Sequence, residues 1–439
     1  MACINLRPLA SLISVIWVHV ALAAQAQTDG PVGRRWLEVG FEQRIRSEWL
    51  TAPFRARNQG ATRTLVTQTR LALEITDGLG PFRMGLELQD ARDSLTDGLF
   101  FEPEDQVNQL DILQLGLGFS SQSFLGRDLQ TELQIGRVTT DIGSRRLVAR
   151  NVMRNTTNAF DGVIWQLGRP REWRFQGLVT RPVVIATTAL DSSRLGGDFW
   201  GAYFEKPLFD QGQVDLYYFG FRSDDHAGSE RHYSTTGTRF YRQPTVRRFD
   251  LDFEYMKQFG RYRNLLHRAS FHHLQLGYTF AAAWEPRLSV HYDYASGDEA
   301  PDDGRSGQFD TLFGARAFEY SPTGIYGPLA RANLKSTGLR LLTNPTRWVN
   351  LVAFYRTVWL EEARDLWVET GLQDLAGVSG NFVGHHIDTR VRLRPIHEMM
   401  VDVGYSRFLK SAYFESVPSS PGRSPSGYLF GSVVLRLSL

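Results

Sequence analysis

The stretch "RRFDLDFEYMKQ", residues 247–258, alternates apolar and charged side chains with a period of two. In an extended strand, one face carries Phe249, Leu251, Phe253 and Tyr255. The other face carries Arg248, Asp250, Asp252 and Glu254. "RLSVHYDYAS" (287–296) and "HIDTRVRLRP" (386–395) repeat the pattern. A soluble sandwich usually has shorter and less charged strands, so the pattern favours a membrane β-barrel that is apolar outside and polar inside.

The connections between such strands fall into two alternating classes. Tight turns are expected at 77–81, 168–172, 208–212, 242–245, 285–286, 344–346 and 394–398. Longer polar segments lie at 94–106, 138–156, 183–197, 223–232, 298–332, 361–383 and 410–426. Bacterial outer-membrane barrels have short periplasmic turns and long extracellular loops, so the long segments are expected outside the cell.

The alternation predicts eighteen strands. Their expected spans are 35–47, 62–76, 82–93, 107–119, 128–138, 156–167, 172–182, 198–207, 213–223, 233–242, 246–259, 269–284, 287–297, 333–343, 346–360, 384–394, 398–409 and 427–439. An even number places both chain ends on the periplasmic side. The predicted fold is therefore all-β: a transmembrane antiparallel β-barrel of about 18 strands, a size that leaves an aqueous channel.

The first 26 residues have the features of a secretory signal peptide. Arg7 precedes an apolar run, and Ala24-Gln25-Ala26 matches a cleavage pattern. Residues 27–439 then form one barrel domain, which contains no cysteine because Cys3 lies in the signal. Beyond the signal, no apolar run reaches the roughly 18 residues that a membrane-spanning helix needs. The expected location is the outer membrane.

The basic residues are almost all arginine, since only Lys206, Lys257, Lys335 and Lys410 are lysines. A genome rich in G and C explains such a bias, but arginine is also the side chain that binds carboxylates in a bidentate manner. Formal charge is nearly balanced, at +2 for the full chain. The average charge therefore indicates no partner, and no nucleic acid is expected.

Arginines gather in "GRVTTDIGSRRLVARNVMRNTTNAFDG", residues 136–162. The segment contains Arg137, Arg145, Arg146, Arg150 and Arg154. It contains only two acids, Asp141 and Asp161. We expect these arginines on the long loop between the fifth and sixth strands. If that loop folds inward, the arginines form a cationic constriction that selects anions. The alternative is that they brace the loop through acids of neighbouring strands, and a mixture of both roles is expected.

Further arginines are expected on the inward face of the wall. The candidates for anion binding are Arg248, Arg340, Arg390, Arg392 and Arg394. Inward acids are about as numerous, so much of the wall should be a lattice of ion pairs. Selectivity then depends on local excess of arginine, as at 390–394 and 137–154.

Residues 136–162 resemble the characteristic segment of the alginate export family. The correspondence covers Gly136-Arg137, Gly143, Arg146-Leu147-Val148, Asn155 and Phe160-Asp161-Gly162. A second stretch, residues 309–334, is similar to the long loop and following strand of that family. The sequence departs from the family at Ala149, Met153 and Asn158. The resemblance implies an outer-membrane porin with an arginine-rich lumen, and structural roles for Gly136, Gly143, Asn155, Phe160, Asp161 and Gly162.

Catalytic and metal-binding alternatives have weaker support in the sequence. Asp224, Asp225, His226 and His232 could activate water in an outer loop, but no nucleophile can be placed opposite them. The His272-His273 and His385-His386 pairs point to opposite faces of a strand, so neither pair can hold one metal ion. A calcium site at 297–304 competes with a simple solvated loop. We therefore expect no enzymatic activity, no metal and no cofactor.

The predicted function is passage of an anionic solute, most of all an acidic polysaccharide such as alginate. A porin for small organic anions is the alternative within transport. A surface-loop enzyme or adhesin is the alternative of another class. The expected partners are outer-membrane lipid, lipopolysaccharide, the anionic solute and periplasmic secretion components.

Overall fold

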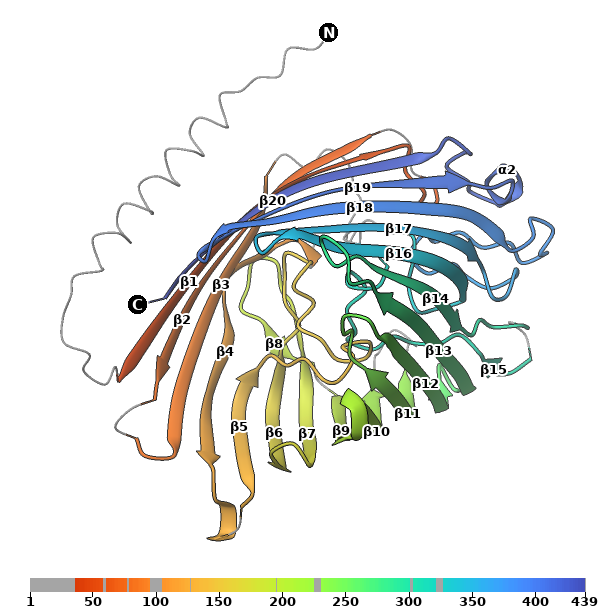
Figure 1. Cartoon of the computed structure of the whole chain (residues 1–439). Coiled ribbons are helices and arrows are strands. Elements are labelled where there is room, and N and C mark those ends of the chain that lie inside the picture. The colour runs from red at the N-terminus through yellow and green to blue at the C-terminus, as the bar shows by residue number, and fades with distance from the viewer. Residues whose placement is uncertain are drawn as a thin grey trace.

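The computed structural model describes residues 36–57, 61–76, 79–94, 105–126, 128–194, 196–224, 230–300, 303–320 and 327–438. The predicted signal peptide, residues 1–26, lies outside these ranges. No helix in the described part of the chain is long and apolar enough to cross a membrane. The chain is instead organised as one sheet (Figure 1).

Eighteen strands form the wall: β1 (Leu37–Thr51), β2 (Thr62–Ile75), β3 (Phe82–Ser94), β4 (Asn108–Ser121), β5 (Gln130–Val138), β6 (Phe160–Arg169), β7 (Trp173–Val184), β9 (Gly197–Pro207), β10 (Gly212–Ser223), β11 (Arg231–Arg242), β12 (Phe249–Tyr262), β13 (Leu265–Thr279), β14 (Arg287–Ala295), β16 (Leu334–Thr346), β17 (Val349–Trp359), β18 (Phe382–Ile396), β19 (Met399–Lys410) and β20 (Ser426–Ser438). Two short strands, β8 (Ser192–Ser193) and β15 (Arg305–Ser306), and the helix α2 (Tyr413–Ser416) lie in loops. The first and last strands pair antiparallel from Gly40–Ser438 to Thr51–Gly427, which closes the ring. The predicted 18-stranded antiparallel barrel is confirmed.

The wall alternates as the sequence predicts. On β12, Asp250, Asp252 and Glu254 are buried inside the barrel, whereas Phe249 and Phe253 are exposed on its outer surface. Outward residues of adjacent strands lie opposite one another and form continuous apolar rows. One such row crosses β12, β13, β14 and β16 at Leu251, Leu276, Val290 and Leu339. Such rows face lipid.

One outer connection is shorter than predicted. Residues 260–268 were expected to join two strands as a loop, but β12 and β13 remain paired up to Tyr262–Leu265. The turn consists of Arg263 and Asn264 alone, with φ angles of 50° and 63°. Two successive residues with positive φ form a two-residue hairpin turn whose twist matches the twist of the flanking strands. This hairpin therefore extends both strands.

Two long loops fold into the ring of strands, residues 139–159 and the described parts of 296–333 (Figure 1). They are joined to each other by backbone hydrogen bonds. Phe313 N donates to Leu147 O at 2.9 Å, and Ala149 N donates to Phe313 O at 3.1 Å. Because the loops cover part of the inner wall, that wall is apolar there: Phe199, Phe219 and Phe221 point inward and are almost fully buried.

Candidate functional site: the barrel lumen and its inward loops

Arg137 was predicted to lie on the inward loop, but it belongs to the barrel wall. Strands β5 and β6 stay paired up to Val138–Phe160, and Arg137 lies opposite Asp161. Its Nε and Nη2 lie 2.8 and 3.1 Å from the two carboxylate oxygens of Asp161. Side chains two residues apart share a face, so Arg137 is on the same face as Ile135, which is 50 % exposed on the outer surface. The pair braces the point where the chain turns inward.

Arg146 lies between the wall and the second inward loop and is buried among three carboxylates. Its Nη2 is 3.1 Å from Asp252, and it also contacts Glu254 on β12 and Glu319 on the second inward loop. Arg331 binds the other side of Glu319 at 2.6 Å. Burial acts to lower the pKa of Arg146, but the three carboxylates outweigh it and hold the pKa well above its usual value. Arg146 therefore ties both loops to the wall.

The three remaining loop arginines differ in their surroundings. Arg150 is 3.5 Å from Glu87, and Arg154 is 3.0 Å from Asp105. Burial lowers the pKa of Arg154, against the opposing effect of Asp105. Arg145 is exposed and lies over the ring of Phe318, 4.8 Å from its centroid, with no carboxylate bound to it in the described part of the chain.

The wall arginines named from the sequence occupy three kinds of position. Arg390 and Arg392 face inward on β18, 3.7 and 2.5 Å from the same carboxylate, Asp402. Arg394 follows on the same face and is exposed. Arg340 faces inward on β16 and donates to the backbone carbonyl of Glu319 at 2.7 Å.

Arg248 was predicted to face the lumen from a strand, but it lies in a turn before β12. The chain turns at residues 243–248, and β12 begins only at Phe249. Gln243 and Pro244 are exposed in that turn, and Arg248 is exposed with them. The alternating pattern in the sequence continues one residue before the strand begins. Arginine suits a periplasmic turn as well as a polar strand face, so the pattern alone does not mark the start of β12.

The motif residues have structural positions around the loop. Gly136 and Gly162 lie opposite each other, and a Cβ on either would come within 2.3 Å of a backbone oxygen of the next strand. Gly143 has a φ of 52° and packs against the ring of Tyr203. Phe160 stacks on Phe199, 5.9 Å between centroids. These residues set the place and angle at which the loop enters the barrel.

Asn155 is fully buried and holds the loop to β2, to β3 and to the segment before β4. Its Nδ2 lies 2.9 Å from Thr67 O, 2.7 Å from Gln106 O and 3.3 Å from Arg92 O. We expect Asn155→Ala to destabilise the loop by about 2 kcal/mol, because the buried carbonyls lose their donor. Faster amide hydrogen exchange at 151–159 measures this. Asn350→Ala, near a periplasmic turn, is the control and should change nothing; equal exchange in both variants would contradict the role.

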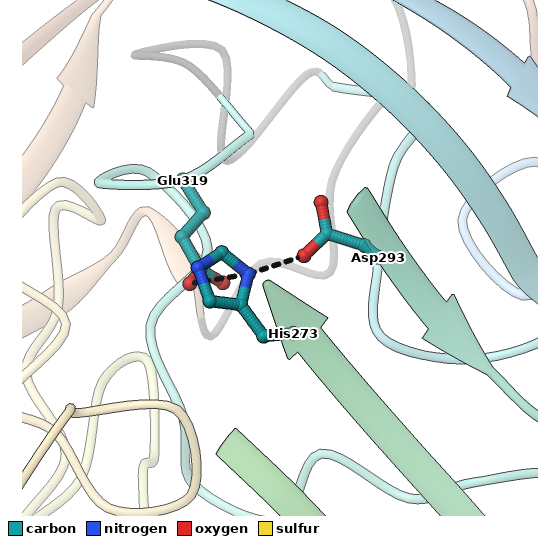
Figure 2. A group of neighbouring side chains, drawn as sticks. All are labelled: His273, Asp293 and Glu319. Atoms are coloured by element: carbon teal, nitrogen blue, oxygen red, sulfur yellow. Dashed lines mark hydrogen bonds and ion pairs between the residues drawn. The ribbon is translucent and has the colours of Figure 1, made fainter. Parts of the chain in front are cut away.

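A buried group that the sequence analysis missed consists of His273, Asp293 and Glu319 (Figure 2). His273 Nδ1 is 2.6 Å from Asp293 Oδ1 and 3.7 Å from Glu319 Oε1. His273 and Asp293 are directly opposite each other on β13 and β14, a register that the sequence did not reveal. Arg356 contacts Asp293, while Arg146 and Arg331 contact Glu319. Three guanidinium groups already neutralise the carboxylates, so the group fits an ion-pair network better than a metal site.

The outer-loop candidate for catalysis is only partly described, because Asp225 and His226 lie outside the described residues. Asp224 and His232 do lie together, with 2.5 Å between Oδ1 and Nε2. The Asp224 carboxylate is also 2.8 Å from Arg222. An aspartate shared between a histidine and an arginine at the exposed rim has the geometry of a surface ion-pair cluster.

The family model described as alginate export matches residues 35–419. The chain belongs to the alginate export family. No curated protein matches it in sequence.

Solved structures similar to this barrel include three proteins of Pseudomonas aeruginosa at 12 % identity. The outer membrane protein OpdK has a TM-score of 0.61 and the match covers 91 % of this chain and 99 % of that one. OccK2 (OpdF), solved in complex with glucuronate, has a TM-score of 0.60 with 91 % and 98 % covered. OccK5 (OpdH) has a TM-score of 0.57 with 92 % and 98 % covered. This alginate-export barrel is an outer-membrane channel.

Proposed function

We propose that this channel passes an anionic solute, namely an acidic polysaccharide such as alginate, along arginines of the inner wall. The observation that carries the proposal is the series Arg390, Arg392 and Arg394 on β18. Alternate residues of a strand are about 7 Å apart, so the three guanidinium groups form a track along the wall. Asp402 is the only carboxylate that contacts them among the described residues.

Other inward arginines are bound by carbonyl groups instead of carboxylates. Arg340 donates to Glu319 O, and Arg44 donates to Arg154 O at 2.6 Å and to Asn155 Oδ1 at 3.2 Å. A carbonyl satisfies the hydrogen bonds of a guanidinium group without cancelling its charge. These positions therefore leave positive charge in the lumen, as does the exposed Arg145.

The mechanism we propose is electrostatic. Guanidinium groups replace the hydration of carboxylates at several weak sites, and the solute moves by exchange between them. Arginine keeps its charge at any physiological pH, so no proton transfer is needed. Such passage requires neither a metal nor a nucleophile, and we propose no enzymatic activity.

The alternative is a channel for small organic anions. The observation that favours it is that the two inward loops occupy the ring and are bonded to each other. A structurally similar barrel was solved with glucuronate, a single acidic sugar. Current block by oligouronates of increasing length separates the two functions. Block that persists from single uronates to long chains supports the polysaccharide, whereas block by single uronates alone supports the small anion.

The track is tested by Arg390→Ser, Arg392→Ser and Arg394→Ser together. We expect the anion-to-cation permeability ratio in planar bilayers to fall by about tenfold, if the three charges contribute about 1.4 kcal/mol together. Removing three outward arginines, Arg63, Arg181 and Arg407, is the matched control and should leave the ratio unchanged. Parental selectivity in the track variant would place the filter elsewhere.

A further inference from the structure

Three cationic side chains stand together on the outer surface of the β12–β13 hairpin. Lys257 and Arg261 lie on β12, and Arg268 lies on β13 opposite Phe259, between them. All three are exposed, on the same face as Phe253 and Leu274, the lipid-facing residues of these strands. Arg261 is four positions along the strand from Lys257, so the cluster spans about 13 Å.

The cluster combines three cations that have no acidic partner among the described residues. Several outward cations at the corresponding ends of other strands are paired: Arg92 with Asp90 at 2.9 Å, Arg181 with Asp198 at 3.3 Å, Arg222 with Asp224 at 2.8 Å and Lys335 with Glu361 at 3.0 Å. In the ranges that the structure describes, Lys257, Arg261 and Arg268 form neither ion pairs nor hydrogen bonds. Three unpaired like charges repel one another, so an anion bound between them would stabilise the arrangement.

The height of the cluster on the barrel follows from the aromatic residues below it. Tyr255 and His272 pack with 4.9 Å between ring centroids, and His272 and Tyr294 with 5.2 Å. Rings of this kind mark the edge of the membrane. Lys257 is two residues after Tyr255 on the same face of β12, closer to the end of the barrel that carries the long loops. The three cations therefore lie at the head groups of the outer leaflet.

Apolar side chains stand among the cations. Phe259 and Leu266 are 43 % and 41 % exposed and lie on the same outward face. A ligand of this surface must carry both negative charge at the cation level and acyl chains that lie along the apolar rows. Outer-leaflet glycolipids with two phosphates on an acylated disaccharide have this combination.

We propose that the β12–β13 hairpin is a docking site for the phosphorylated lipid A part of lipopolysaccharide. Arg261 and Arg268 hold one phosphate, and Lys257 with Arg268 holds the other. Guanidinium groups bind phosphate oxygens in a bidentate manner, and the lysine acts as a point charge. Phe259 and Leu266 contact the first methylene groups of the acyl chains. The site is separate from the lumen, since its side chains point away from it.

The test compares purified barrels in detergent by native mass spectrometry with defined lipids. The parent should retain bisphosphorylated lipid A, monophosphorylated lipid A less well, and phosphatidylglycerol least. Replacing Lys257, Arg261 and Arg268 by Ser should weaken bisphosphorylated lipid A binding on the order of 100-fold, from about fivefold per cation. Exchanging Lys and Arg at the three positions should preserve binding.

The matched control removes an outward ion pair, Arg181→Ser with Asp198→Ser, and should leave lipid A binding unchanged. Slower gel migration after boiling shows that each variant is folded. Equal binding of phosphatidylglycerol and lipid A by the parent would overturn the proposal, as would full binding by the Ser variant. Ion selectivity in phospholipid bilayers without lipopolysaccharide should be unaltered by these variants, so this test and that of the anion track succeed or fail separately.

Discussion

Arg146→Met should release both inward loops from the wall while the barrel remains closed. Among the described residues the substitution leaves Glu254 buried without a cation, and leaves Glu319 with Arg331 as its remaining arginine partner. Loss of one partner from a buried charge network costs roughly 3–5 kcal/mol. Because residues 147 and 149 are hydrogen-bonded to Phe313 of the second loop, the cost acts on both loops together. Amide hydrogen exchange at 142–149 and 313–315 should rise by two orders of magnitude or more.

Arg145→Met is the matched control for this variant. Arg145 is the adjacent residue, of the same chemistry, but its side chain is exposed and, among the described residues, contacts the ring of Phe318 and no carboxylate. Its replacement should alter loop exchange little. Adding Glu254→Gln to Arg146→Met should recover part of the loss, because the carboxylate left without a cation disappears while Glu319 keeps Arg331. Equal exchange in the Arg145 and Arg146 variants would show that the network does not hold the loops.

Acid provides an independent measure of the same network. Burial acts to raise the pKa of Glu319, but Arg146, Arg331 and His273 outweigh it and lower the pKa to about 2. A carboxylate whose pKa is lowered by folding stabilises the native loops above its ordinary pKa, and this stabilisation disappears as pH falls toward the lowered value. Parental loop exchange should therefore increase between about pH 4.5 and pH 2.

Val290→Arg should destabilise the barrel by roughly 2–4 kcal/mol. Val290 is 54 % exposed and belongs to the outward apolar row with Leu251, Leu276 and Leu339. The row lies between the aromatic residues Tyr278 and Tyr294, so a charge there enters the hydrocarbon region. The free energy of unfolding from lipid vesicles in denaturant measures the cost.

The control for Val290 is an inward substitution of the same kind, Gln134→Arg. Gln134 faces the lumen and is hydrogen-bonded to Glu132 at 2.7 Å. An arginine there remains in water and gains a carboxylate neighbour, so the free energy of unfolding should change by less than about 1 kcal/mol. Equal costs at Val290 and Gln134 would show that the two faces are assigned wrongly.

The wall of this protein could be predicted from the sequence because its physical cause is local. A strand between lipid and water has side chains of period two, and "RRFDLDFEYMKQ" shows that period without any tertiary information. The eighteen strands and the short turns were predictable in the same way, whereas the family was predicted from the resemblance of residues 136–162 to its characteristic segment. Errors arose at strand ends, as at Arg248 and the β12–β13 turn, where polar residues suit a strand and a turn equally.

The interior could not be predicted, because its contacts join residues far apart in the chain. The count of only two acids within residues 136–162 suggested uncompensated arginines, yet Arg146 is neutralised by Glu254 and Glu319, which are 108 and 173 positions away. His273, Asp293 and Glu319 likewise meet only when two strands and a loop are in register. Alternation determines which face a side chain takes, but only the closed ring decides which charges share that face. The distinction between bracing arginines and those left to attract an anion therefore depends on tertiary structure.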